Sequence, residues 1–393
     1  MSNRLIIKNF GPIREADIEL KPFLVLIGGQ GTGKSTIVKV LTICLDIVFY
    51  LRILKGDDTH IPFREFGIDE YFKDNSYISF QFNGIALEYK DGQFQWTSTE
   101  YPDTSKAYKA FDTHLNNITQ GLLKPYIGEQ KITPEIIHEY AGLVRPNSRM
   151  ALYIPAERNL IGNLSPALAS ILTAGVPLQK ILLEYMSLFE KAKQEFQIYP
   201  VDFLHLTFKK SGADETIEIS DGEEKCPVPL NHCSSGIQSI LPLLMVIDYS
   251  MKLKCFDLFV LEEPEQNLFP SNQTELLRFL ISKTHATDFS AKGFMITTHS
   301  PYLLSALNIS LLAGELAKDK ELAEAVEKIL PSAYHLDPSQ LSAYALGDEE
   351  TWCRSIINEK TGTIDQNYLD TASDVLGDEF NRLYRLYLKT VRR

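Results

Sequence analysis

A stretch near the N-terminus constrains the fold of this chain more than any other. Residues 23–27 are all apolar, and they are followed by GGQGTGKST at positions 28–36. The next segment, 37–50, has apolar residues at helical spacing. Strand, glycine-rich turn and helix are the context in which GxxxxGK(S/T) forms a phosphate-binding loop. We therefore expect a strand, a phosphate-binding loop and a helix in this order.

Each residue type in this loop suits the binding of phosphate or Mg²⁺. Glycines let the backbone curl until its N–H groups point at phosphate oxygens, and the following helix adds the positive end of its dipole. Lys34 is expected to reach the β- and γ-phosphates, and Ser35 to hold Mg²⁺. A turn that binds nothing is the alternative, but a chance match is on the order of a per cent. The predicted nucleotide-binding residues are Gly28, Gly29, Gln30, Gly31, Thr32, Gly33, Lys34, Ser35 and Thr36.

Length and composition narrow the class of protein. A chain of 393 residues fits one large or two modest domains. Its net charge of -12 argues against a surface that coats DNA, although it allows a local basic patch. Five cysteines without a CxxC pair favour a reducing compartment. We expect a cytoplasmic protein without a membrane span, because no apolar run approaches about 18 residues and the start lacks a signal-peptide core.

Hydrophobic patterning divides the chain into four regions. Residues 1–100 contain the loop and alternating β segments, with hairpin signals at Asn83-Gly84 and Asp91-Gly92. The region 101–200 has a helical pattern interrupted by a strand at 150–155. Strands and helices alternate over 201–310, which predicts an α/β fold with a mainly parallel core sheet. The hairpin signals in 1–100 predict an antiparallel β part beside it. Residues 311–393 are predicted to be helical.

Acidic residues end a second buried strand. Residues 256–261 are followed by Glu262 and Glu263, where carboxylates can face the phosphates from the carboxyl edge of the sheet. We expect Glu262 to bind the metal and Glu263 to polarise the attacking water. His299, at the end of the buried strand 293–297, is expected to donate to the γ-phosphate. A surface turn and a structural histidine are the alternatives.

The order of these parts resembles a known family. A serine turn, Ser234-Ser235-Gly236-Ile237-Gln238, opens an apolar helix between the loop and the acidic strand. Together with the segments EEPEQNLFP and TTHSPYLL, it resembles an ABC-type ATPase head of the RecF, SMC and OLD-like group. The resemblance covers residues 1–50 and 230–310 well and the middle of the chain poorly.

This resemblance implies a mechanism that uses two copies of the chain. Such heads form head-to-tail homodimers that hold two ATP molecules and Mg²⁺ between them. Ser234, Gly236 and Gln238 of one copy would then meet the phosphates held by the other, with Asn267 and Leu268 in the loop that crosses the interface. Phe269 departs from the pattern, since many relatives have His there. Gln81 and the pair Glu157-Arg158 both remain candidates for the glutamine of the family's Q-loop, and the pair is equally explained as a structural ion pair.

The remaining segments bear on partners. No long coiled coil and no Toprim nuclease motif are found in the sequence, so the resemblance implies a stand-alone head with a separately encoded effector. Contact with DNA is left open, because the tail carries Arg382, Arg385, Lys389, Arg392 and Arg393. By family analogy we expect a role in DNA repair or antiviral defence. The alternatives are a nucleotide-gated scaffold with little turnover and a transporter nucleotide-binding subunit.

Overall fold

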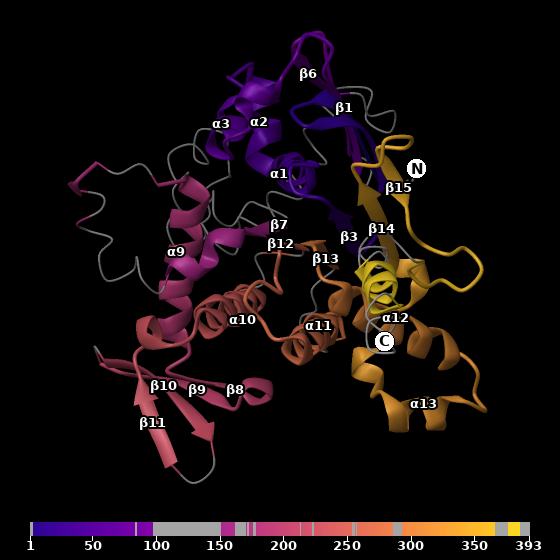
Figure 1. Cartoon of the computed structure of the whole chain (residues 1–393). Helices are drawn as coiled ribbons and strands as arrows, with labels where there is room; N and C mark the ends of the chain where they lie inside the picture. Colours follow the sequence, from indigo (N-terminus) through magenta and orange to yellow (C-terminus); the bar gives the residue numbers. More distant parts are fainter. Residues whose placement is uncertain are drawn as a thin grey trace.

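A six-stranded sheet forms the centre of the molecule. The computed structural model describes residues 3–82, 85–96, 151–161, 170, 173–175, 178–212, 214–221, 224–253, 256, 258–285, 293–365 and 376–385. The strand order is β15-β14-β3-β13-β12-β7 (Figure 1). The first five of these strands in chain order are parallel to their neighbours, and β15 is antiparallel to β14 at one edge. The predicted α/β fold with a mainly parallel core is therefore confirmed. The strands are β3 (Phe23–Gly28), β7 (Ala151–Ile154), β12 (Leu258–Glu262), β13 (Gly293–Thr298), β14 (Leu341–Leu346) and β15 (Cys353–Ser355).

Helices cover both faces of this sheet because its central strands are apolar on both sides. Leu24 and Leu26 of β3 pack in the same cluster as α1, whereas Val25 and Ile27 pack in the cluster that contains α10, α11 and α12. Figure 1 accordingly shows α1 on one side of the sheet and α10 and α11 on the other. The helix after the phosphate-binding loop and the helix after the serine turn therefore lie on opposite faces. The four helices are α1 (Lys34–Cys44), α10 (Ser235–Leu253), α11 (Pro270–Thr284) and α12 (Pro301–Leu316).

The apolar segment 37–50 forms parts of two helices instead of one. Helix α1 ends at Cys44, and α2 (Ile47–Lys55) begins after Asp46. The carboxylate of Asp46 accepts a hydrogen bond from the backbone N–H of Val48 at 2.9 Å. A carboxylate that caps a new helix start stabilises the break, and this local signal competes with the continuous apolar pattern.

An antiparallel sheet stands beside α1, as predicted for residues 1–100. Its order is β2-β1-β4-β5-β6. The turn between β5 and β6 is Asp91-Gly92, and both residues have positive φ angles, 52° and 82°, as a tight two-residue hairpin requires. The short helix α3 (Ile61–Glu65) packs through Phe63 into the apolar cluster that also contains residues of this sheet and of α1. The strands are β1 (Arg4–Phe10), β2 (Ile13–Glu19), β4 (Tyr77–Phe82), β5 (Ile85–Lys90) and β6 (Gln93–Trp96).

A second antiparallel sheet, of order β11-β10-β9-β8, lies beyond α10 (Figure 1). The sequence pattern predicts two strands here, at 202–210 and 215–220, and these correspond to the central strands β9 (Leu206–Ser211) and β10 (Asp214–Asp221). The outer strands β8 (Ile198–Val201) and β11 (Glu224–Val228) were not predicted. Helix α9 (Lys180–Glu195) belongs to the expected insert of 101–200. Residues 101–150 of that insert lie outside the described residues.

The prediction that 311–393 is wholly helical is wrong. Helix α13 (Ala323–Ile329) is present, but β14 enters the core sheet beside β3, and β15 follows it. The segment LSAYAL is short and nearly all buried, and a short apolar run cannot be told from a helix by periodicity alone. Its parallel pairing with β3 decides the outcome.

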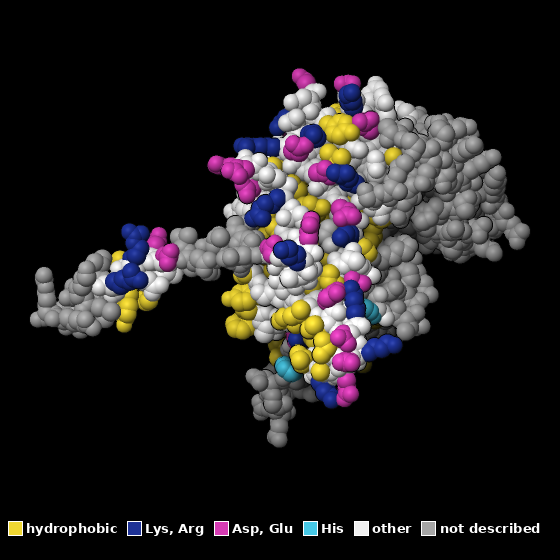
Figure 2. Space-filling model, turned by 90° about the vertical axis from the view of Figure 1, so that its right-hand side faces the viewer, with side chains coloured by type: hydrophobic (Ala, Val, Ile, Leu, Met, Phe, Trp, Pro, Cys, Tyr) yellow, Lys and Arg dark blue, Asp and Glu magenta, His cyan; other side chains and the backbone are white. Residues whose placement is uncertain are grey.

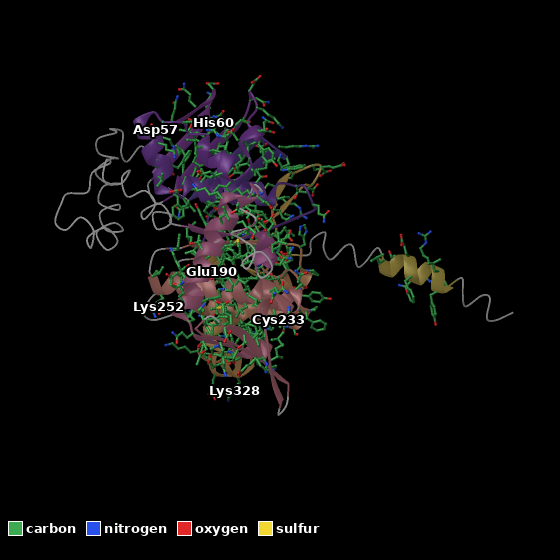
Figure 3. All side chains as sticks on the ribbon, turned by 90° about the vertical axis from the view of Figure 1, so that its left-hand side faces the viewer. Asp57, His60, Glu190, Cys233, Lys252 and Lys328 are labelled. Carbon is green, nitrogen blue, oxygen red and sulfur yellow. The ribbon has the colours of Figure 1, made fainter. Side chains whose placement is uncertain are left out.

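Apolar side chains gather on the outer surface of the C-terminal part. Tyr302, Ile309 and Leu312 of α12 are each about half exposed, and Ile329 of α13 is more exposed than these. Figure 2 shows apolar atoms on the lower half of this face. Residues 376–385 form a helix that lies apart from the rest of the described chain and carries Arg382 and Arg385 (Figures 2 and 3). No helix among the described residues is long and apolar enough to cross a membrane.

Candidate active site

The candidate residues converge because parallel strands end at one edge of the core sheet. Glu262 at the end of β12 pairs with Thr297 of β13, and Thr298 pairs with Ile27 of β3. Leu346 of β14 pairs with Gly28 at the start of the phosphate-binding loop. The glycine loop, the acidic pair and the segment with His299 therefore follow neighbouring strands.

The loop has the backbone shape that its glycines permit. Gly31 and Gly33 have φ angles of 75° and 88°, in the left-handed region that suits glycine. The side chain of Lys34 is buried, and its Nζ donates to the carbonyl oxygens of Gly28 at 2.8 Å and Gly29 at 3.0 Å. Ser35 is exposed at the first turn of α1. The side chain of Lys34 therefore folds back onto the loop, while Ser35, the residue after it, is exposed.

A segment that sequence reasoning missed supports the loop from one side. A side chain at Gly28 or at Gly347 would collide with Thr32, so both backbones approach this threonine closely. Thr32 Oγ1 also donates to the carbonyl oxygen of Gly29 at 2.9 Å. Gly347 follows β14 and has a φ angle of 94°. The only advance signal was a glycine after a short apolar run.

Glu262 has the environment expected of a metal ligand. Its side chain is 5% exposed, and its Oε1 has no hydrogen-bond partner among the described residues. A buried carboxylate oxygen without a partner is costly, and a hard cation is a natural partner. Burial lowers the pKa of Lys34, while the carboxylates of Glu263, Glu262 and Glu265 oppose that shift. Ser35 and Glu262 thus fit a Mg²⁺ ion, although no cluster of three or more His, Cys, Asp or Glu residues forms a metal site within the described chain.

Glu263 and His299 face each other across two strand ends. Glu263 Oε1 lies 3.4 Å from His299 Nε2, and each side chain is about one third exposed. Glu263 has a positive φ of 42°, and its backbone N–H donates to the carbonyl oxygen of Thr297 at 3.0 Å. Burial lowers the pKa of His299, Lys34 adds to this shift, and Glu263 opposes it. Backbone strain at a non-glycine residue is typical of functional sites.

Arg158 holds the backbone beneath the two acids. It is fully buried. Its Nη1 donates to the carbonyl oxygen of Glu262 at 2.7 Å and of Pro155 at 3.2 Å, and its Nη2 to that of Glu263 at 2.5 Å. Burial lowers the pKa of its guanidinium, with opposing effects from nearby acids. Arg158 therefore contacts backbone oxygens instead of forming an ion pair with Glu157. Gln81, the other Q-loop candidate, lies on β4, where it pairs with Arg4 and Ala86.

Sequence reasoning also missed two buried polar residues, Glu265 and Gln273. Glu265 Oε1 accepts hydrogen bonds from Thr298 Oγ1 at 2.5 Å and from the backbone N–H of His299 at 3.1 Å. Gln273 Nε2 donates to the carbonyl oxygen of Leu268 at 2.9 Å, and its Oε1 accepts from Ser300 Oγ. The only sequence signal for Glu265 was its position two residues after the acidic pair. Gln273 lies on an ordinary helix, and the sequence gave no signal for it.

The serine turn is exposed at the start of α10. Ser234 and Ser235 are exposed, and Ser234 Oγ lies 3.5 Å from the backbone nitrogen of Ile237. A side chain at Gly236 would bring a Cβ within 2.7 Å of the Asn267 carbonyl oxygen, so the turn and the loop after the acids are in contact within one chain. Figure 3 shows Cys233, next to this turn, far below His60.

Gln238 lies inside the serine turn. Its side chain is 8% exposed. Its Nε2 donates to the carbonyl oxygens of Cys233 at 2.8 Å and Asn231 at 3.2 Å. In this structure Gln238 therefore stabilises the turn that presents Ser234 and Gly236, and the nucleotide contact predicted for it stays a prediction.

Three solved structures of SMC heads are similar to this chain at low sequence identity. An SMC head domain from Thermotoga maritima is 14% identical, with a TM-score of 0.38, over 78% of this chain and 92% of the other. An SMC head bound to the C-terminal winged-helix domain of ScpA is 12% identical, with a TM-score of 0.41, over 92% and 99% of the two chains. An SMC head from Pyrococcus furiosus with an extended coiled coil, bound to the C-terminal domain of ScpA, is also 12% identical, with a TM-score of 0.40, over 95% and 98%. No curated protein matches the chain.

A family model gives the decisive comparison. The model described as an AAA ATPase domain matches residues 1–153 and 163–304. The two matched ranges include the glycine loop, the serine turn, the acidic pair and His299. A match over well more than half of the chain establishes its family: the protein belongs to the AAA ATPase domain family and is an ATPase.

Proposed function

We propose that two copies of this chain close head to tail around two ATP molecules with Mg²⁺, and that hydrolysis opens them again. The observation that carries this proposal is the placement of the serine turn. Ser234 is exposed at the start of α10, on the face of the core sheet opposite to α1, which begins with Lys34. A turn that faces outward at a helix N-terminus is suited to bind an anion held by another molecule.

The residues of the site divide the work of hydrolysis. The loop 28–36 would hold the phosphates through its backbone N–H groups and Lys34. Ser35 and Glu262 would hold Mg²⁺, which neutralises charge on the phosphate oxygens. Glu263 would orient and deprotonate the attacking water, and the water's proton would pass to its carboxylate. His299 would donate a hydrogen bond to the γ-phosphate as charge develops there.

The family resemblance favours a separately encoded effector in DNA repair or antiviral defence, in the cytoplasm. Cys44, Cys233 and Cys353 are free thiols, which agrees with a reducing compartment. Measuring the ATPase rate with and without double-stranded DNA would test the DNA contact. A rate that does not change with DNA would remove DNA from the proposal.

Mixing two inactive variants tests the shared site directly. Lys34→Ala disables the loop, and Ser234→Arg disables the serine turn. In a head-to-tail dimer, a mixed pair contains one site built from the intact loop of one copy and the intact turn of the other. Equal amounts of the two variants should therefore recover up to about a quarter of the wild-type site activity.

The control is each variant alone at the same total concentration, which should stay inactive. If the mixture also stays inactive while both variants are folded and the wild type hydrolyses ATP, the two-copy site is wrong. A single-copy site predicts that outcome. A scaffold with little turnover predicts instead that the wild type itself does not hydrolyse ATP.

A further inference from the structure

Two segments of the active site are joined by hydrogen bonds that the reaction roles above do not use. The carboxylate of Glu265 bonds to the end of β13 through Thr298 Oγ1 and the backbone N–H of His299. It comes from the loop after β12, which also carries Glu263. One buried carboxylate therefore connects this loop, called the acidic loop below, to the backbone of His299.

Gln273 makes a second connection between the same two segments. From α11 it donates to the carbonyl oxygen of Leu268 in the acidic loop and accepts from the hydroxyl of Ser300, next to His299. Ser300 Oγ in turn accepts from the backbone N–H of Leu303 at 3.2 Å, at the start of α12. Thr298 and Ser300, on the two sides of His299, are thus hydrogen-bonded to the acidic loop or to a residue that contacts it. Thr298 bonds to Glu265 of the loop, and Ser300 bonds to Gln273.

We propose that Glu265 is a positioning residue for ATP hydrolysis, which acts by fixing the backbone of His299 against Glu263. This inference rests on the role proposed above for His299. It assigns no contact between Glu265 and the nucleotide. Gln273 supports the same arrangement from the other side of the loop.

The cost of burying Glu265 favours a functional role over a purely structural one. Its side chain is 8% exposed, and its Oε2 has no hydrogen-bond partner among the described residues. A hydroxyl or an amide could accept from the backbone N–H of His299 with a smaller desolvation penalty. Groups that are costly to bury and lie next to reacting residues are frequently part of the mechanism.

A double-mutant cycle with His299 tests the proposal. Glu265→Met keeps the volume and removes the acceptor. It should lower kcat roughly 10- to 100-fold, with little change in KM for ATP, because His299 loses its alignment. In a His299→Ala background the same substitution should cost nothing further, since it acts through a side chain that is no longer there. Glu265→Gln, whose amide oxygen can still accept from His299, should recover most of the lost kcat.

The controls separate positioning from folding. Glu324→Met, at an exposed position of α13, should leave kcat and melting temperature at wild-type values. Binding of a fluorescent ATP analogue should persist in Glu265→Met, which excludes global unfolding as the cause of lost turnover. A second variant, Gln273→Leu, should lower kcat in the same way and also show no further effect in the His299→Ala background.

The possible outcomes are distinguishable. If His299→Ala lowers kcat but Glu265→Met does not, or if the two losses multiply in the double variant, the positioning role is overturned and the proposed function stands. If His299→Ala itself leaves kcat unchanged, the proposed role of His299 fails, and the inference about Glu265 fails with it. Loss of analogue binding in both Glu265→Met and Gln273→Leu would assign these residues to structure alone.

Discussion

His299 Nε2 lies 3.4 Å from Glu263 Oε1, although the two residues follow different strands of the core sheet. The distance is slightly longer than a normal hydrogen bond. The strand that leads to His299, β13, also pairs with β3, which leads into the phosphate-binding loop. In the proposed mechanism, Glu263 would act on the attacking water while His299 acts on the γ-phosphate.

Replacing the proposed base should separate ATP binding from hydrolysis. In Glu263→Gln the shape is kept but proton abstraction is lost, so kcat should fall by about 10²- to 10⁴-fold. The variant should accumulate as an ATP-bound dimer, which size-exclusion chromatography with light scattering would detect. A variant that stays monomeric with saturating ATP, while still binding it, would contradict the proposed closure.

Removing the buried guanidinium of Arg158 should mainly lower the stability of the protein, with a smaller effect on its affinity for the nucleotide. Arg158→Met leaves the carbonyl oxygens of Glu262 and Glu263 without this donor, and we expect a loss of about 2–4 kcal/mol in the free energy of unfolding. Urea denaturation measures this loss. Arg64→Met, at a half-exposed ion pair, is the control and should leave the stability nearly unchanged, because exposed ion pairs contribute little. Equal effects of the two variants would show that Arg158 supports little.

The buried carboxylate of Glu265 should make stability fall as the pH rises. Burial raises its pKa above the ordinary value of 4.5, against the opposing hydrogen bonds from Thr298 and His299. The folded state therefore binds more protons than the unfolded state above pH 4.5, and its stability declines as the pH passes through the raised pKa. Glu265→Gln removes this titration. Its melting temperature should exceed that of the wild type at pH 7 to 8, and the difference should shrink toward pH 4.5; a constant difference would refute the assignment.

Phe269 should contribute to the proposed contact between copies. It is 73% exposed at the end of the acidic loop, and large exposed apolar residues near a site often mark an interface. Phe269→Asp should weaken the ATP-dependent dimer of the Glu263→Gln variant at least tenfold, because it places a charge in the contact. Analytical ultracentrifugation gives the dissociation constant. The matched control is Ile329→Asp on α13, which is 82% exposed and should leave the dimer intact.

The parts of the site that were predictable are those whose function dictates a local pattern. The glycine loop and the acidic pair each follow an apolar strand, so the local sequence pattern is enough to indicate both sites. Arg158 and Glu265 could not be identified in this way, because their roles arise from contacts with backbone atoms more than 30 residues away. Strand β14 was missed for a related reason. Its six residues form a strand only because β3 offers an unpaired edge.

The position of β14 beside β3 has a consequence for synthesis of the chain. The strand that leads into the glycine loop leaves the ribosome long before one of its two neighbours, which ends only at Leu346. At ordinary translation rates this interval lasts on the order of tens of seconds. Throughout that time the edge of β3 is open to pairing with other polypeptides. A nascent chain of this kind thus cannot complete its nucleotide cradle until β14 has been synthesised, and premature termination before Leu346 yields a product that lacks part of it.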